Sequence, residues 1–332
     1  MSCEDVKSFG SCDGMNSGSA AAVVFEEPGK LAIRQVGLKD RSASDCLVDI
    51  EWTGISTGTE RLLWSGKMPP FPGLAYPLVP GYESVGRVAV SDDTGSIPVG
   101  TRVFVPGSTG FSDVHGLFGG AAERLVAPSD RLVKVDENLE DEAILLALAA
   151  TAYHTIDSFG PNRYPDLVVG HGTLGRLIAR LVIALGGDAP TVWEKNPCRK
   201  SGSVGYQVIE SADDPRVDYD AICDVSGDGS LLNDLIQRMR PGGCIVLAGF
   251  YDQPLSFSFT PAFIRESSIK IAAQWQPGDL DAIQLLIKEE KLSLGGLISH
   301  RSSASAAAPA YRQAFEDADC LKMVIDWRVN NE

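Results

Sequence analysis

The segment Asp166-Leu-Val-Val-Gly-His-Gly-Thr-Leu-Gly175 decides the fold of this 332-residue chain. A short apolar strand runs directly into a complete Gly-x-Gly-x-x-Gly pattern. The first glycine permits a tight turn, the second lets a pyrophosphate approach the backbone, and the third lets helix and strand pack closely. Amide groups at the start of the helix then face the phosphates. The segment predicts a dinucleotide site made by Gly170, His171, Gly172, Thr173, Leu174 and Gly175.

The residues after the glycines strengthen this prediction. Apolar residues from Leu174 to Leu185 fall on one face of a helix. Glu194 ends the next strand-like run, 24 residues after Gly170, where a carboxylate is expected to bind the adenosine ribose. A carboxylate there repels a 2′-phosphate, so the sequence favours NAD over NADP. Lys195, with Arg199 and Lys200, is either a compensating positive charge or part of a solvated loop.

The chain divides into two patterns. Four strand-like runs alternate with helical ones at 166–169, 191–194, 221–225 and 244–248, which predicts a parallel, doubly wound sheet. Before residue 140 the strands are short and separated by Gly and Pro, which predicts an irregular β-barrel. We expect a disordered tail at 1–20, a barrel domain made of 21–142 and 276–332, and a dinucleotide domain at 143–275. Met15 precedes the first strand-like run and is an alternative to Met1 as the first residue.

Composition excludes several classes of partner. The formal net charge is −15 and the sequence pI is near 4.7, so the chain repels nucleic-acid phosphates. No apolar run reaches the roughly 18 residues of a membrane-spanning helix. The seven cysteines are irregularly spaced and lack a Cys-x-x-Cys pair, which favours a reducing compartment, the cytoplasm.

The order of these parts, from residue 22 on, resembles the medium-chain dehydrogenase/reductase superfamily. The matching motifs are Gly81-Tyr82-Glu83, Gly119-Gly120-Ala121-Ala122-Glu123, Thr151-Ala152-Tyr153-His154, Arg240-Pro241-Gly242-Gly243 and Cys320-Leu321-Lys322. The resemblance implies an α/β fold with a GroES-like barrel and a Rossmann domain. It also implies a homodimer paired along a sheet-edge strand at 268–273. Further cofactor contacts are expected at the carboxyl ends of strands, from Ser226, Gly249 and Phe250.

A narrower resemblance lies in the runs 54–66, 68–73 and 76–86, which look like the bacteriochlorophyllide a dehydrogenases. This implies a tetrapyrrole substrate, a chlorophyllide or bacteriochlorophyllide, whose 3-(1-hydroxyethyl) group is oxidised to 3-acetyl while NAD takes the hydride. Two alternatives stay open. One is a zinc-independent NAD(P)H reductase of conjugated C=C bonds or quinones, and the other is a non-catalytic dinucleotide-binding protein.

Many members of the superfamily hold a catalytic zinc, but the residues at the expected ligand positions here are Ser56, Tyr82 and the apolar run 147–150. Hydroxyls and alanines do not hold Zn²⁺ against water, so we expect no metal. The alcohol proton must then leave through side chains. The candidates are Ser56, Thr57, Thr59, Glu60, Tyr82, Glu83 and His154. Tyr82 either lies at the reacting oxygen or fills the space that the metal left.

An apolar, proline-rich stretch follows these candidates. Its aromatic residues are Trp64, Phe71 and Tyr76. They either present a surface on which a flat tetrapyrrole stacks, or line the core of the small domain.

Overall fold

The computed structural model describes residues 18–328. Residues 1–17 of the expected tail, Met15 among them, lie outside the described residues. Ser19 and Ala20, which we expected in that tail, instead begin the first strand, where Ala20 is fully buried. The tail prediction was therefore too long at its C-terminal end, because the small residues Ser19 to Ala22 pair as a strand despite their weak apolar pattern.

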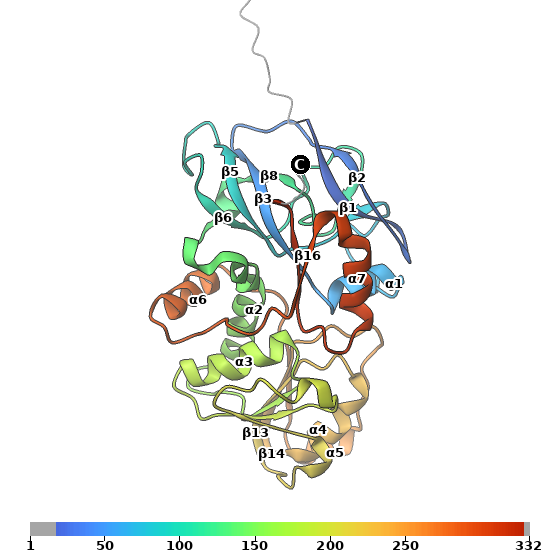
Figure 1. The fold of residues 1–332 in the computed structure, drawn as a ribbon. Helices are drawn as coiled ribbons and strands as arrows, with labels where there is room; N and C mark the ends of the chain where they lie inside the picture. The colour runs from blue at the N-terminus through green and yellow to red at the C-terminus, as the bar shows by residue number, and fades with distance from the viewer. Residues whose placement is uncertain (1–17, 329–332) are drawn as a thin grey trace, which may run out of the picture.

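A six-stranded parallel sheet forms the lower half of the molecule in Figure 1. Its strands lie in the order β12-β11-β10-β13-β14-β15. Their bounds are β10 (Leu167–Val169), β11 (Thr191–Trp193), β12 (Gln207–Ile209), β13 (Tyr219–Asp224), β14 (Met239–Leu247) and β15 (Ser268–Ile271). Counted from β10, this is the order 3-2-1-4-5-6 of a doubly wound dinucleotide-binding sheet, as predicted.

Helices connect and cover these strands. The helix predicted after the glycine loop is α3 (Thr173–Ala184), in which Leu177, Ile178, Leu181 and Val182 are buried. The others are α2 (Leu146–Asp157), α4 (Leu232–Arg238), α5 (Phe259–Ile264) and α6 (Asp279–Lys288). Among residues 18–328, none of the helices has both the length and the apolar character needed to cross a lipid bilayer.

Two antiparallel-rich sheets form the predicted irregular barrel (Figure 1). One has the order β2-β1-β4-β7, and the other has the order β16-β17-β3-β5-β6-β9 with β8 paired to β3. The bounds are β1 (Ser19–Glu27), β2 (Lys30–Gly37), β3 (Asp45–Ile55), β4 (Leu78–Val79), β5 (Ser84–Val90), β6 (Arg102–Val105), β7 (His115–Gly116), β8 (Arg124–Pro128), β9 (Val133–Lys134), β16 (His300–Ser303) and β17 (Met323–Asp326).

The C-terminal segment returns to the barrel and completes it. Strand β17 pairs antiparallel with β3, so Met323 lies opposite Ile55. Helix α7 (Ala307–Glu316) precedes β17 and lies beside the short helix α1 (Thr59–Ser65) in Figure 1. The end of the chain thereby reaches the turn that follows β3, where several candidate catalytic residues lie.

Candidate active site

The glycine loop has the geometry of a phosphate-binding turn. Gly170 adopts a left-handed backbone conformation with φ 105°, which favours glycine. A Cβ on Gly175 would overlap the carbonyl oxygen of Gly170, so only glycine lets α3 pack this closely. A Cβ on Gly172, in contrast, would meet no atom within 4 Å. The open face at Gly172 and the N-terminus of α3 fit a dinucleotide pyrophosphate.

The remaining predicted cofactor residues gather at the same edge of the sheet. Strand β10 lies between β11 and β13, so the strand order reverses next to Gly170. The backbone of Ser226, just after β13, is 3.3 Å from where a Cβ on Gly170 would lie. The amide of Gly249 donates to the carbonyl of Asp224 at 3.2 Å, and Phe250 follows with 40% of its surface exposed. Ligands of open α/β sheets bind in this crevice.

Glu194 connects the end of β11 to the glycine loop. Its Oε2 accepts a hydrogen bond from the amide of His171 at 3.0 Å, and its Oε1 accepts from the amide of Asn196 at 2.8 Å. Carboxylate oxygens have further lone pairs, so these bonds fix the carboxylate while leaving acceptor capacity for ribose hydroxyls.

The His171 side chain supports the loop from behind. It is fully buried, with Nε2 2.8 Å from the Tyr206 hydroxyl and Nδ1 2.6 Å from the carbonyl oxygen of Arg199. Burial lowers the pKa of His171 to about 4, so the ring is neutral near neutral pH. The structure thus places this side chain inside the protein, where its hydrogen bonds hold the glycine loop.

The three cations after Glu194 have partners of their own. Lys195 is 3.5 Å from Asp228, and Lys200 pairs with Glu210 at 2.5 Å. The Arg199 guanidinium donates to the carbonyls of Ala318 and Cys320, near the C-terminus.

A pair of hydroxyls lies at the turn after β3. The Ser56 Oγ and the Tyr82 Oη are 2.8 Å apart, and Ser56 is buried. Ser56 follows β3, and Tyr82 lies between β4 and β5, so two neighbouring parts of the barrel position the pair. Burial and the nearby Glu83 carboxylate raise the pKa of Tyr82, while hydrogen bonds with Ser56 and Thr59 lower it less. Tyr82 is therefore a neutral phenol near neutral pH.

Glu83 belongs to a buried ion pair beside these hydroxyls. Its two carboxylate oxygens accept hydrogen bonds from the Lys322 ammonium at 2.9 and 2.8 Å. The same ammonium donates to the carbonyl of Ile55 at 3.2 Å, and both side chains are almost fully buried. This pair ties the C-terminal segment to β3 and fixes the loop that carries Tyr82.

A catalytic zinc, which the fold family implies, does not fit these residues. At the ligand positions there are two hydroxyls bonded to each other and buried alanines. A neighbouring carboxylate, Glu83, is paired with Lys322, whose positive charge opposes a second cation. Throughout residues 18–328, no three His, Cys, Asp or Glu side chains are grouped to hold a metal ion.

The predicted substrate residues lie in different surroundings. Phe71 is 38% exposed. The centroid of its ring is 6.1 Å from that of Phe118, and the Phe118 centroid is 5.4 Å from that of Tyr82. These three rings form a row that leads to the hydroxyl pair. Trp64 instead packs edge-on against Phe25 at 5.6 Å. The Tyr76 hydroxyl donates to the carbonyl of Leu63, so the surroundings of both Trp64 and Tyr76 belong to the barrel core.

The other candidates are more dispersed. The His154 imidazole, in the last turn of α2, pairs with Asp279 of α6 at 3.6 Å. Thr57 is half-buried in the turn after β3. Sequence reasoning missed Phe118, Tyr311 and Lys322. Lys322 did carry a signal, because it is a single charge directly before the apolar strand Met323–Asp326.

Comparisons with known proteins agree with this architecture. Residues 42–137 match the alcohol dehydrogenase GroES-like domain. The 2-desacetyl-2-hydroxyethyl bacteriochlorophyllide A dehydrogenase of Rhodobacter capsulatus is 53% identical, over 92% of this chain and 98% of the relative. The protein of the same name from Cereibacter sphaeroides is 51% identical over the same shares.

Solved structures show the same fold at lower identity. The short chain alcohol dehydrogenase of E. coli CFT073, complexed with NADH, aligns with a TM-score of 0.79 at 20% identity and covers 93% of this chain and 100% of its own. This likeness concerns the fold alone. The identity to the two bacterial dehydrogenases goes further, and on it the chain belongs to the family of 2-desacetyl-2-hydroxyethyl bacteriochlorophyllide A dehydrogenases.

Proposed function

We propose that this protein is an NAD-dependent dehydrogenase that oxidises the 3-(1-hydroxyethyl) group of a chlorophyllide or bacteriochlorophyllide to 3-acetyl. The observation that carries the proposal is 53% identity over nearly the whole length of a relative with that substrate in its name. The glycine loop and the hydroxyl pair supply the two halves of such a site, one for a dinucleotide and one for an alcohol.

The residues of the chain have separate tasks in this reaction. A bound NAD supplies the acceptor for the hydride. The loop from Gly170 to Gly175 and Glu194 hold its pyrophosphate and ribose. Ser56 and Tyr82 hydrogen-bond the alcohol oxygen and begin the removal of its proton. The half-exposed Phe71, with Phe118 behind it, offers an aromatic surface to the macrocycle.

We propose that the reaction proceeds without zinc. The residues at the ligand positions do not fit the metal, and the substrate itself lowers the need for it. The reacting carbon is attached to a conjugated macrocycle, so charge that develops as the hydride leaves is delocalised into the ring. Less electrostatic stabilisation is then required from the protein.

The preference for NAD over NADP is expected to depend on Glu194. Its carboxylate repels a 2′-phosphate, and the three neighbouring cations have partners already. We expect Glu194→Ala to lower the ratio of kcat/KM for NAD to that for NADP at least about tenfold, about 1.4 kcal/mol. Steady-state kinetics with both cofactors measures this ratio. The control is Glu289→Ala, which removes a surface carboxylate at the C-terminal end of α6. An unchanged ratio would remove Glu194 from cofactor selection.

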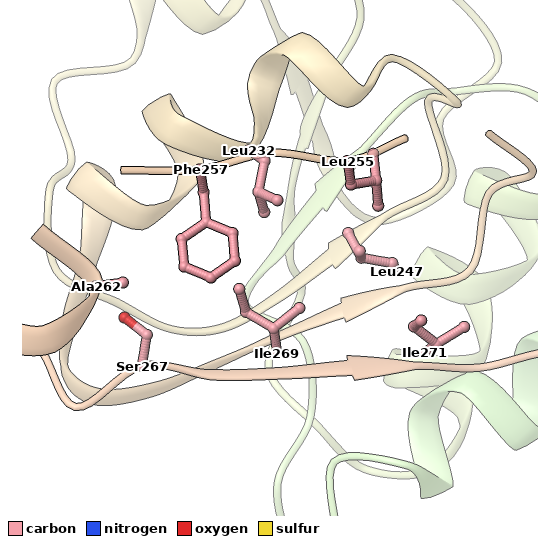
Figure 2. A pocket seen from close by; sticks show the side chains of 8 residues that line it. All are labelled: Leu232, Leu247, Leu255, Phe257, Ala262, Ser267, Ile269 and Ile271. Carbon is pink, nitrogen blue, oxygen red and sulfur yellow. The ribbon is translucent and has the colours of Figure 1, made fainter. Parts of the chain in front are cut away.

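We also propose a homodimer formed along β15. This strand ends the sheet, and Ile271 on it is 79% exposed. Figure 2 shows Ile269 and Ile271 lining an apolar hollow with Leu255 and Phe257. An apolar, unpaired sheet edge of this kind is a template for pairing with a second strand.

The dimer has a direct test. Sedimentation is expected to show twice the chain mass of 35.4 kDa, and Ile271→Lys is expected to shift the protein to monomer. Leu285→Lys, which changes an exposed leucine of α6, is the matched control. A wild-type protein that sediments as a monomer at micromolar concentration would refute the pairing.

The proposed reaction is tested by its product. Protein, NAD and a 3-(1-hydroxyethyl) bacteriochlorin are mixed, and the pigment is analysed by mass spectrometry. We expect one 3-acetyl pigment, two mass units lighter by loss of two hydrogens, for each NADH formed. No acetyl product, with NADPH consumed by quinones instead, would support a reductase.

A further inference from the structure

Two carboxyl groups are buried beside the hydroxyl pair, and they have different partners. Glu83 is bound through both oxygens to Lys322. Glu60, in the first turn of α1, is also fully buried. Its Oε1 accepts a hydrogen bond from the amide of Ser56 at 2.8 Å, but its Oε2 makes no hydrogen bond of normal geometry.

The charges in this pocket do not balance if both acids are ionised. Lys322 is the cation that faces them, and Glu83 takes its hydrogen bonds. The other titratable groups around Glu60 are Tyr82 and, from α7, Tyr311, neither of which is positive. Burying an ion without a partner costs several kcal/mol, so such a group takes up a proton instead.

The direction of the pKa shift agrees with this geometry. Burial raises the pKa of Glu60 to about 8, and the charge of Glu83 raises it as well. The Ser56 amide, Tyr311 and Lys322 act in the opposite direction but do not outweigh burial. Glu60 therefore exchanges a proton near the pH at which a dehydrogenase operates, which is the favourable range for a base.

Glu60 lies beside the hydroxyl pair, with its second carboxylate oxygen making no hydrogen bond of normal geometry. Its carboxyl group is bonded to the backbone of Ser56, and the side chain of Ser56 is bonded to Tyr82. Tyr82 itself does not retain a negative charge, because burial and Glu83 raise its pKa. A proton that enters the hydroxyl pair must continue to a group that holds it.

We propose that Glu60 is the group that receives the alcohol proton, acting through the Ser56–Tyr82 pair. This inference rests on the proposed function. The C–H bond of the carbinol breaks and its electron pair passes with hydrogen to the nicotinamide, which is reduced. The O–H bond breaks, a C=O bond forms, and an O–H bond forms on the Glu60 carboxylate. Glu60 is thus a positioning residue that holds the proton, whereas Glu83 is paired with Lys322 and holds the loop.

The test uses Glu60→Gln in the full-length protein. Glutamine keeps the size and the oxygen that accepts from the Ser56 amide, but it cannot take up a proton. Glu142→Gln is the matched control, because Glu142 is a half-buried acid, with its pKa raised by burial, in the 3₁₀ segment Glu137–Leu145. NAD binding by each variant shows whether the site is intact.

Two readouts separate a proton-holding role from a structural one. In the wild type, kcat/KM for alcohol oxidation is expected to rise with pH and level off above about 8. In Glu60→Gln the value is expected to fall about 100-fold, and this rise is expected to disappear. The infrared difference spectrum, wild type minus Glu60→Gln, is expected to show a protonated carboxylic acid that is lost above pH about 8.

The outcomes are distinguishable. If Glu60→Gln keeps its activity within about tenfold and keeps the pH profile of the wild type, the proposal is wrong. If the infrared difference shows no protonated acid at neutral pH, the proposal is wrong as well, whatever the kinetics. If the wild type does not oxidise the pigment but the acid band is present, the proposed function is wrong, while the inference that Glu60 is a buried protonated acid stands.

Discussion

The Tyr82→Phe protein is expected to oxidise the hydroxyethyl pigment about 10²- to 10⁴-fold more slowly than the wild type. Phenylalanine keeps the ring that packs against Phe118 but removes the hydroxyl that bonds Ser56. The loss should appear mainly in kcat, because the hydroxyl acts on the proton rather than on the macrocycle. Single-turnover rates of NADH formation measure it.

A control variant shows whether removing a tyrosine hydroxyl elsewhere in the protein has the same effect. The Tyr164 hydroxyl donates to the carbonyl of Leu185 at the end of α3, away from the hydroxyl pair. We expect Tyr164→Phe to turn over normally. A loss in Tyr82→Phe smaller than about tenfold would mean that Tyr82 only fills the space that a metal occupies in other members of the superfamily.

Replacing Lys322 by methionine is expected to destabilise the protein by about 3–5 kcal/mol. The substitution leaves the Glu83 carboxylate buried without its cation and removes the hydrogen bond from the ammonium to the carbonyl of Ile55. Unfolding in urea, followed at equilibrium, measures the change. Because β17 pairs with β3 next to this site, the barrel domain should unfold at a lower urea concentration than the dinucleotide domain.

The loss of stability is expected to be large because the ion pair is buried. A surface ion pair of the same kind tests this dependence on burial. Lys291 and Glu289 form a pair of similar length, 2.8 Å, but on the surface. Lys291→Met is expected to cost less than about 1 kcal/mol. Adding Glu83→Gln to Lys322→Met should restore part of the stability, since the unpaired charge is then removed. Equal losses for Lys322→Met and Lys291→Met would contradict the role assigned to the buried pair.

The parts of the fold that depend on local patterns were predictable from sequence. The strand, glycine loop and helix from Leu167 to Ala184 are consecutive, so spacing alone identified them. The strand β5 at Ser84–Val90 is one of the short strands predicted before residue 140. The parallel arrangement followed from the alternation of strands and helices, because parallel strands need crossover connections.

The charge state of the site was not predictable in this way. Glu60 and Glu83 were both named as candidates, but the difference between them depends on partners near the C-terminus. Lys322 is 239 positions from Glu83, and Tyr311 comes from α7. No periodicity connects such distant residues.

Aromatic side chains presented a similar difficulty. A proline-rich stretch predicts that its rings are held in place, but not which way they face. Trp64 packs in the barrel core, while Phe71 stays accessible and meets Phe118 from a separate loop.

The proposed oxidation of the alcohol without a metal ion is tested most directly by removing metal from the protein. The protein is dialysed against a strong chelator, its zinc content is determined by elemental analysis, and NADH formation from the hydroxyethyl pigment is then followed. We predict full turnover with far less than one zinc per chain. Activity that is abolished by the chelator and restored by one equivalent of Zn²⁺ would contradict the account.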